Sequence, residues 1–462
     1  MEDWTQTLDA GPLLLIAAGA IALILLLIIK FKVHAFITLV LVSLLTAVMA
    51  GIPIAGVATT MIGGFGGTLG TVALLVGLGA MLGRLIEHSG GAHALAERFV
   101  QIFGEKRAPF ALGIASLILG FPMFFDAGLI MMLPIIFAIA RRVSSANVLL
   151  FGIPAAAAFS VMHVFLPPHP GPVTAIEAYD ANLGVVMLVG LVIVFPVWYI
   201  SGYVWGKFVA SRNLLPVPLL FGDVDEDQPV NPPKVSTVIM LLLLPMVLIF
   251  LNTGLSTLGS MGVVDTTQAW AQALILIGNS SIALLITVIV ATIVLGWRRG
   301  ENGTALEKII DSSLGPIASV VLITGAGGMF GAVLRASGIG DALSDTLSDL
   351  GLPVIVAAYL IAVILRIAQG SATVALVTAA GLIAPAVLVA DFNVLEVAAI
   401  TLATAAGSVF AGHVNDSGFW LVGRLMGMDV KTTLKTWTVQ QTLESVVAFV
   451  LVLVVYLIGS LI

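Results

Sequence analysis

The residues best suited to chemistry in this sequence are single charges inside long apolar stretches. Asp126 is the only charged residue from 109 to 140, within GFPMFFDAG, and Arg366 is the only one between Asp349 and Asp391, within RIAQGSAT. An aspartate in such a place can take up a proton, accept a hydrogen bond from a hydroxyl group, or cap a helix. An arginine can hold a carboxylate through two parallel hydrogen bonds, or it can be a structural partner of Asp126 or of backbone carbonyl groups nearby.

Two histidine-containing segments, MHVFLPPHPGP and AGHVNDSGFW, are the next candidates. An imidazole titrates near neutral pH and can carry a proton, although a single histidine in an apolar run can equally be structural. His163 and His413 recur at an offset of 250 residues, and each is followed by valine. We therefore expect both segments to be unwound helix ends that face one site, with a plain cytoplasmic loop as the alternative for the second. His169 is expected near the outer surface.

Polar residues beside these charges supply neutral hydrogen-bonding groups, which can contact hydroxyl groups of a ligand or cap broken helices. The predicted ligand-binding residues are Phe125, Arg366, Gln369, Ser371, Thr373, Asn415 and Ser417. The predicted proton-carrying residues are Asp126, His163, His413 and Asp416.

The composition places these residues in a membrane. Of the 462 residues 60% are hydrophobic and 10% charged, and the mean hydropathy is +1.15, whereas soluble proteins carry about 25% charged residues. The net charge of -6 without a basic patch excludes nucleic-acid binding. The absence of cysteine excludes disulfides, Cys-ligated zinc and thiol nucleophiles. The acidic N-terminus lacks the basic region of a cleaved signal peptide, so the first apolar run is expected to remain as a span.

No cofactor or metal is predicted from the motifs. The segment GGFGGTLG at 63–70 lacks the Gly-Lys-Ser/Thr ending of a phosphate loop, and it fits tight helix packing or a flexible turn. No spacing of histidine and carboxylate residues indicates a metal site. Without a nucleotide-binding motif, energy for any transport must come from an ion gradient.

The positive charges that flank the apolar runs predict an all-α membrane protein with two unusual elements. Lysine and arginine mark the cytoplasmic side of a span. On this rule both ends of 109–140 lie on the cytoplasmic side, and both ends of 353–390 lie on the outer side. Each stretch is too short for two spans, so we expect two re-entrant helical hairpins beside about ten transmembrane helices, with both termini outside.

The chain divides into two halves, 1–211 and 235–462, joined by an acidic, proline-rich cytoplasmic linker at 212–234. Residues 77–95 match residues 325–343 at an offset of 248, with eight identities in nineteen positions. Two halves of opposite orientation, each with a broken element, are typical of an inverted-repeat secondary transporter whose substrate binds at the broken helices.

Three contiguous segments carry a family resemblance. GGFGGTLGTVALLVGLGAMLGRLIEHSGGA, GFPMFFDAGLIMMLPI and HVFLPPHPGPV resemble the gluconate permease family of gluconate:proton symporters, and HVNDSGFW fits as well. The resemblance spans nearly the whole chain. It implies uptake of gluconate or a related small sugar acid with a proton across a bacterial inner membrane. It also implies likeness to the wider ion-transporter superfamily, whose members use paired hairpins and often form homodimers.

The predicted mechanism places an organic anion between the two hairpin tips, held by Arg366 and free helix N-termini, while Asp126, with His163 or Asp416, takes the proton. Three alternatives remain open at this point. One is a transporter of the same architecture for D-serine or another small hydroxylated carboxylate, with sodium in place of the proton. The others are an intramembrane enzyme, against which the internal repeat argues, and a passive channel.

Overall fold

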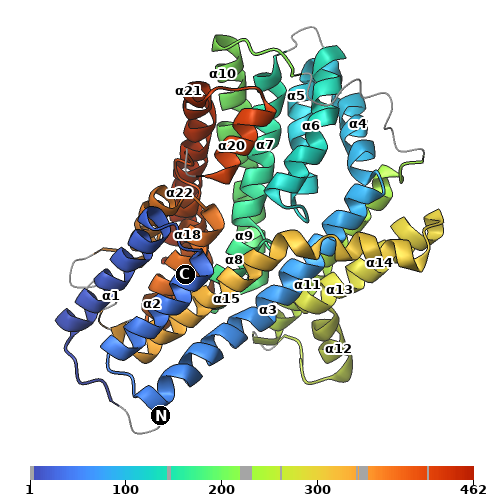
Figure 1. The fold of residues 1–462 in the computed structure, drawn as a ribbon. Helices are drawn as coiled ribbons and strands as arrows, with labels where there is room; N and C mark the ends of the chain where they lie inside the picture. The colour runs from blue at the N-terminus through green and yellow to red at the C-terminus, as the bar shows by residue number, and fades with distance from the viewer. Residues whose placement is uncertain are drawn as a thin grey trace.

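The computed structural model describes residues 5–142, 147–218, 231–260, 263–339, 342, 352–413 and 416–462. Within these ranges the chain is helical apart from short turns, loops and one isolated β-bridge between Asn147 and Pro216. Of the predicted linker, residues 219–230 lie outside the described ranges. Figure 1 shows the helices with the labels used below.

The first half contains α1 (Ala10–Leu25), α2 (Ala35–Met49), α3 (Ile54–His88), α4 (Gly91–Phe103), α5 (Ala108–Gly120), α6 (Phe125–Arg142), α7 (Val148–Phe165), α8 (Pro170–Ala178), α9 (Leu183–Trp198) and α10 (Trp205–Arg212). The second half contains α11 (Val235–Ser260), α12 (Ala269–Ile277), α13 (Ser280–Ala291), α14 (Gly303–Asp311), α15 (Leu314–Ala336), α17 (Val354–Gln369), α18 (Ala372–Val389), α19 (Val394–Ser408), α20 (Ser417–Leu425), α21 (Val430–Thr433) and α22 (Val439–Gly459). Short π-helical segments are η1 (Leu26–Lys30), η3 (Tyr199–Val204), η5 (Thr292–Gly296) and η7 (Leu434–Thr438), and short 3-10 segments are η2 (Glu105–Arg107) and η6 (Trp297–Arg299).

Eight helical stretches among the described residues are long and apolar enough to cross a membrane. Five shorter apolar helices of 10–17 residues accompany them. These lengths confirm the all-helical, multi-pass prediction, because a span of the hydrocarbon core needs about 20 residues. The count of about ten full crossings and the re-entrant geometry of the two hairpins stay predictions.

Helices break inside both predicted hairpin segments. In the first, α5 ends at Gly120 and α6 begins at Phe125. In the second, α17 ends at Gln369 and is capped by Gly370, whose φ of 84° favours glycine. Helix α18 begins after Ser371, whose hydroxyl accepts a hydrogen bond from the backbone of Val374. Each break leaves polar backbone groups that need a protein or water partner at membrane depth.

Helices α3 and α15, which contain the two matching segments, lie side by side across the molecule (Figure 1). Glycine permits their close approach. A Cβ on Gly64 would meet the side chain of Ala332 and would lie 2.9 Å from the carbonyl oxygen of Gly328, while a Cβ on Gly328 would overlap Thr68. Of the two interpretations of GGFGGTLG, tight helix packing is therefore confirmed.

The helices differ in how deeply they lie inside the protein. The stretch Val148–Ala178 is 89% buried and Ala372–Val389 is 78% buried, whereas Val430–Gly459 is 28% buried. The first two therefore form the centre, and polar residues on them face protein interior rather than lipid. This arrangement brings His163 on α7 next to the start of α18.

Candidate functional site

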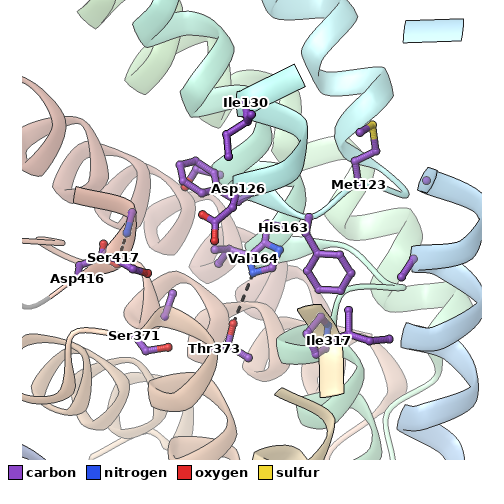
Figure 2. A pocket seen from close by; sticks show the side chains of 18 of the residues that line it. Met123, Asp126, Ile130, His163, Val164, Ile317, Ser371, Thr373, Asp416 and Ser417 are labelled. Atoms are coloured by element: carbon purple, nitrogen blue, oxygen red, sulfur yellow. Dashed lines mark hydrogen bonds between the residues drawn. The ribbon is translucent and has the colours of Figure 1, made fainter. Parts of the chain in front are cut away.

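A cavity of about 710 Å³ lies where the two helix breaks meet. Its wall comes from both halves of the chain: α3, the break before α6, α7, α15, the start of α18, the start of α20 and α22. Figure 2 shows side chains from these elements converging on one space. The predicted residues that line it are Phe125, Asp126, His163, Arg366, Ser371, Thr373, Asp416 and Ser417.

Arg366 and Asp416 form a buried ion pair at the edge of this cavity. The Nη2 atom of Arg366 lies 2.6 Å from Oδ2 of Asp416, and the two residues are 2% and 9% exposed. Nη1 of Arg366 donates to the carbonyl oxygen of Gly370, whereas Nε is buried without a hydrogen-bond partner. The guanidinium therefore joins the break between α17 and α18 to the segment before α20, and its Nε atom makes no hydrogen bond to the described residues.

Asp416 also sets the start of α20. Its Oδ1 atom accepts a hydrogen bond of 2.9 Å from the backbone nitrogen of Gly418, which makes it the N-cap of that helix. Gly412 lies against the pair, because a Cβ there would meet Nη2 of Arg366 and would lie 2.8 Å from Oδ2 of Asp416. Asp416, rather than Asp126, is thus the structural partner of Arg366.

Asp126 stands in the first turn of α6 with its side chain exposed to the cavity (Figure 2). Among the described residues it has no partner at ion-pair distance. Its neighbour Phe125 packs against Trp437, with ring centroids 5.7 Å apart. Asp126 is therefore a carboxyl on the cavity wall, directly beside an apolar surface and without an ion-pair partner in the described part of the chain.

His163 links the two helix breaks through a line of hydrogen bonds. Nε2 of His169 donates to the carbonyl oxygen of Gly120 at 2.8 Å, so Nδ1 of a neutral His169 can accept from Nδ1 of His163 at 3.2 Å. Nε2 of His163 then accepts from the hydroxyl of Thr373 at 3.5 Å, which Figure 2 draws as a dashed line. His169 is 2% exposed, so the expectation that it lies near the outer surface is wrong. The four prolines around it fold the chain back into the interior.

The remaining predicted residues are placed less centrally. The Nδ1 atom of His413 is 3.0 Å from the carbonyl oxygen of Ala411, and His413 is not among the residues that line the cavity. Gln369 ends α17. Asn415 lies outside the described residues.

Sequence reasoning missed Glu444. Its carboxyl group is fully buried on α22 and accepts hydrogen bonds from the side chains of Ser160, Gln440 and Gln441. Glu444 stands at the edge of the last uncharged run, 445–462, and is not among the predicted site residues. The signal was the spacing of Gln440, Gln441 and Glu444, since residues three and four apart share one face of a helix.

One end of the cavity reaches exposed charges. Arg84 forms an ion pair of 3.0 Å with Glu87, and its Nε atom donates to Ser312 at 3.1 Å. All three residues line the cavity, and their side chains are partly open to solvent. Because these lining side chains are open to solvent, this end is a mouth of the cavity.

The arrangement suits a small, polar, anionic molecule. A fixed guanidinium, hydroxyl groups from Ser371, Thr373 and Ser417, and an aromatic surface surround a volume typical of small-molecule sites. No group of three or more potential metal ligands occurs in the described ranges.

Comparison with known proteins also indicates a permease. Residues 12–458 match the profile of the GntP family permease. The chain is 41% identical over 450 residues to the inner membrane permease YgbN of Escherichia coli, covering 95% of this chain and 97% of that protein. It is 37% identical to a gluconate permease of Pseudomonas aeruginosa, with coverage of 96% and 98%, and 37% identical to the Gnt-II system L-idonate transporter of Escherichia coli, with coverage of 96% and 99%.

Two solved structures share the fold. The YdaH transporter of Alcanivorax borkumensis superposes with a TM-score of 0.62 at 14% identity, covering 91% of this chain and 98% of that one. MtrF of Neisseria gonorrhoeae superposes with a TM-score of 0.63 at 15% identity, with coverage of 93% and 96%. The sequence match over nearly the whole chain, together with the multi-pass helical fold, shows that this protein belongs to the GntP family of permeases.

Proposed function

We propose that this permease takes up gluconate or a related small sugar acid together with a proton across the bacterial inner membrane. The observation that carries the proposal is the buried guanidinium of Arg366 at a cavity that hydroxyl groups and apolar side chains also line. Relatives named for gluconate and L-idonate support the substrate class. A sugar acid offers one carboxylate and several hydroxyl groups, which is the pattern that this wall complements.

In the proposed binding mode the substrate carboxylate meets Arg366 at the edge of the cavity. The unpartnered Nε and the forked geometry of the guanidinium suit a carboxylate. Ser371, Thr373 and Ser417 lie at helix starts and contact the hydroxyl groups. The free backbone N–H groups of these helix starts add a positive dipole end for the anion.

The proposed proton compensates the charge of the incoming anion. Asp126 and Asp416 both face the cavity and would repel a carboxylate when ionised. Proton uptake by a carboxyl at this site removes that repulsion, so proton and anion bind more tightly together than apart. Asp126, Asp416, His163 and His413 are the candidates drawn from the sequence.

We further propose that α5–α6 and α17–α18 are re-entrant hairpins of an inverted repeat, and that the mouth beside Arg84 opens to the cytoplasm. Lysine and arginine cluster on that side, as the positive-inside rule requires. Alternating access would then proceed by movement of the broken elements around the bound substrate. A homodimer is proposed from likeness to the superfamily.

The experiment that tests the function is uptake of labelled gluconate into proteoliposomes with an inward proton gradient and no sodium. We expect accumulation that a protonophore abolishes and that unlabelled hexonates compete. Accumulation only when sodium is supplied would move the coupling to sodium. Transport of D-serine in place of gluconate would keep the fold and overturn the substrate.

A further inference from the structure

A buried carboxyl group stands behind the cavity wall and has no part in the mechanism above. Glu444 is 0% exposed, and its three hydrogen-bond donors are buried with it, at 5% for Ser160, 0% for Gln440 and 3% for Gln441. The Ser160 hydroxyl donates to Oε1 at 3.0 Å. The amides of Gln440 and Gln441 donate to Oε2 at 2.9 and 3.2 Å.

All three donors are neutral. Within the described chain, no nitrogen of lysine, arginine or histidine lies at ion-pair distance from Glu444. A carboxylate buried among neutral groups is costly in its charged form, and taking up a proton removes that cost. Asp416 differs because Arg366 neutralises it, and Asp126 differs because its side chain is exposed on the cavity side of the wall. Of these three carboxyl groups, Glu444 is therefore the one whose charged form its surroundings destabilise most.

Glu444 is also connected to the cavity. Ser160 and Gln441 both line the cavity, and Gln441 donates to the hydroxyl oxygen of Ser160 at 2.9 Å. Cavity water can donate a proton to the Ser160 oxygen while the serine passes its own hydroxyl proton to Oε1 of Glu444. An O–H bond forms on the carboxyl, one breaks on the serine, and the hydroxyl is restored.

We infer that Glu444 is the group that carries the coupling proton, which it exchanges with the cavity through Ser160. The inference rests on the proposed proton-coupled uptake and names its carrier. In the cycle, Glu444 is protonated when the anion occupies the cavity and gives up its proton after the anion has left.

Several titratable groups face Glu444 or the elements packed against α22. Arg366 lies close enough to act on Glu444 electrostatically, and it is held by Asp416. Tyr359 bonds to the neighbouring Ser445 at 3.0 Å. The other titratable groups on elements packed against α22 are His163 on α7, Tyr199 and Tyr203 on η3, Lys435 on η7, and Glu396 on α19. Glu396 lies at the opposite end of α22, beside Gly459.

The test compares wild type with Glu444→Gln in proteoliposomes. Glutamine keeps the size and one acceptor oxygen but cannot release a proton, and its NH2 group replaces the other acceptor. We expect gluconate–gluconate exchange at equal pH to persist within about threefold, because exchange needs no net proton movement. A gradient of one pH unit drives about tenfold accumulation in wild type for one proton per anion; in the variant this should fall to equilibration. Proton entry on addition of gluconate, followed with a trapped pH dye, should disappear.

The matched control is Glu396→Gln, a buried carboxyl that completes the capping box of α19. Glutamine also serves in a capping box, so exchange, accumulation and proton entry should match wild type. Glu444→Asp should retain proton entry because it keeps a titratable carboxyl. Accumulation with normal proton entry in Glu444→Gln would overturn the inference.

Two further outcomes are separable. If wild type itself accumulates gluconate without proton entry, the proposed proton coupling fails rather than the identity of its carrier. If Glu444→Gln does not fold, Ser160→Ala provides the test. It leaves the carboxyl group in place and removes the hydroxyl group through which the proton would reach it. We then expect exchange to persist while proton-driven accumulation slows by at least about tenfold, and an unchanged rate would contradict the inference.

Discussion

At the scale of single residues, the site depends on Arg366, a positive charge that already has bonding partners within the protein. Arg366 is bound by Asp416 and Gly370 before any ligand arrives. A substrate carboxylate must therefore share or displace an internal partner. This arrangement keeps the arginine oriented in the empty cavity and avoids the cost of an unpaired buried charge.

Arg366→Lys tests whether the fork of the guanidinium matters. Lysine keeps the charge but loses the paired, planar donors, so we expect the Kd for gluconate to rise about tenfold or more, a loss of about 1.4 kcal/mol. Equilibrium binding to the purified protein measures this. Arg298→Lys, at an exposed position, is the control and should bind as wild type does. Equal affinities in the two variants would remove Arg366 as the anchor.

Gly412→Ala tests the space around the ion pair. The added Cβ would meet Nη2 of Arg366 and lie 2.8 Å from Oδ2 of Asp416, so the pair must shift. Over-packing of this kind costs about 1–3 kcal/mol, and we expect a lower Tm together with weaker gluconate binding. Gly254→Ala, where a Cβ meets nothing within 4 Å, should leave both unchanged. A normal Tm and normal binding in Gly412→Ala would show that the ion pair can shift without loss of stability or affinity.

At the scale of elements, the sequence predicted where helices break but not which contacts join the broken helices to the rest of the protein. Single charges and Gly or Pro clusters in apolar runs located the starts of α6 and α18, because such residues are tolerated at depth only beside protein or water. The partner of Arg366 could not be found this way, since Asp416 is 50 residues away along the chain and no local pattern encodes that contact.

The sequence also did not reveal a buried carboxyl group at the end of an apolar run. Glu444 is absent from the predicted site residues, because a search for uncharged apolar runs stops at a charge. The structure shows the helix continuing from Val439 to Gly459 with Glu444 inside the protein. A helical-face analysis of QQTLE would have grouped its polar residues and placed them on one side.

The crossing of α3 and α15 gives a prediction at this scale. Gly64→Ala places a Cβ 2.9 Å from the carbonyl oxygen of Gly328, whereas Gly63→Ala places one in open space. We expect Gly64→Ala to lower the free energy of unfolding by about 1–3 kcal/mol and Gly63→Ala to leave it nearly unchanged. Thermal unfolding in detergent compares them. Matching Tm values would mean that the two helices can separate without cost.

At the scale of the whole molecule, the cavity has a mouth beside Arg84, which is proposed to open to the cytoplasm. The sequence contains no cysteine, so single introduced thiols can be read without background. We expect Ser312→Cys, at the mouth, to react with a membrane-impermeant thiol reagent in inside-out vesicles and not in intact cells. Ser460→Cys, near the C-terminus that is predicted to lie outside, should show the reverse.

Substrate adds a second comparison to that experiment. Ser371→Cys, deeper in the cavity, should be protected by gluconate, while Ser460→Cys should not. Reaction of Ser312→Cys from the outside would reverse the proposed orientation of the cavity.

The ion pair of Arg366 and Asp416 also has an electrical consequence. Each net charge that crosses a membrane exchanges about 2.3 kcal/mol with every 100 mV of voltage. The two residues cancel each other, and an anion that enters with one proton adds nothing, so the site carries the same charge when loaded and when empty. Voltage then acts equally on the outward and return movements and does no net work over the cycle. A cell whose membrane voltage has collapsed, but whose pH gradient is intact, would fill to the same final ratio of sugar acid.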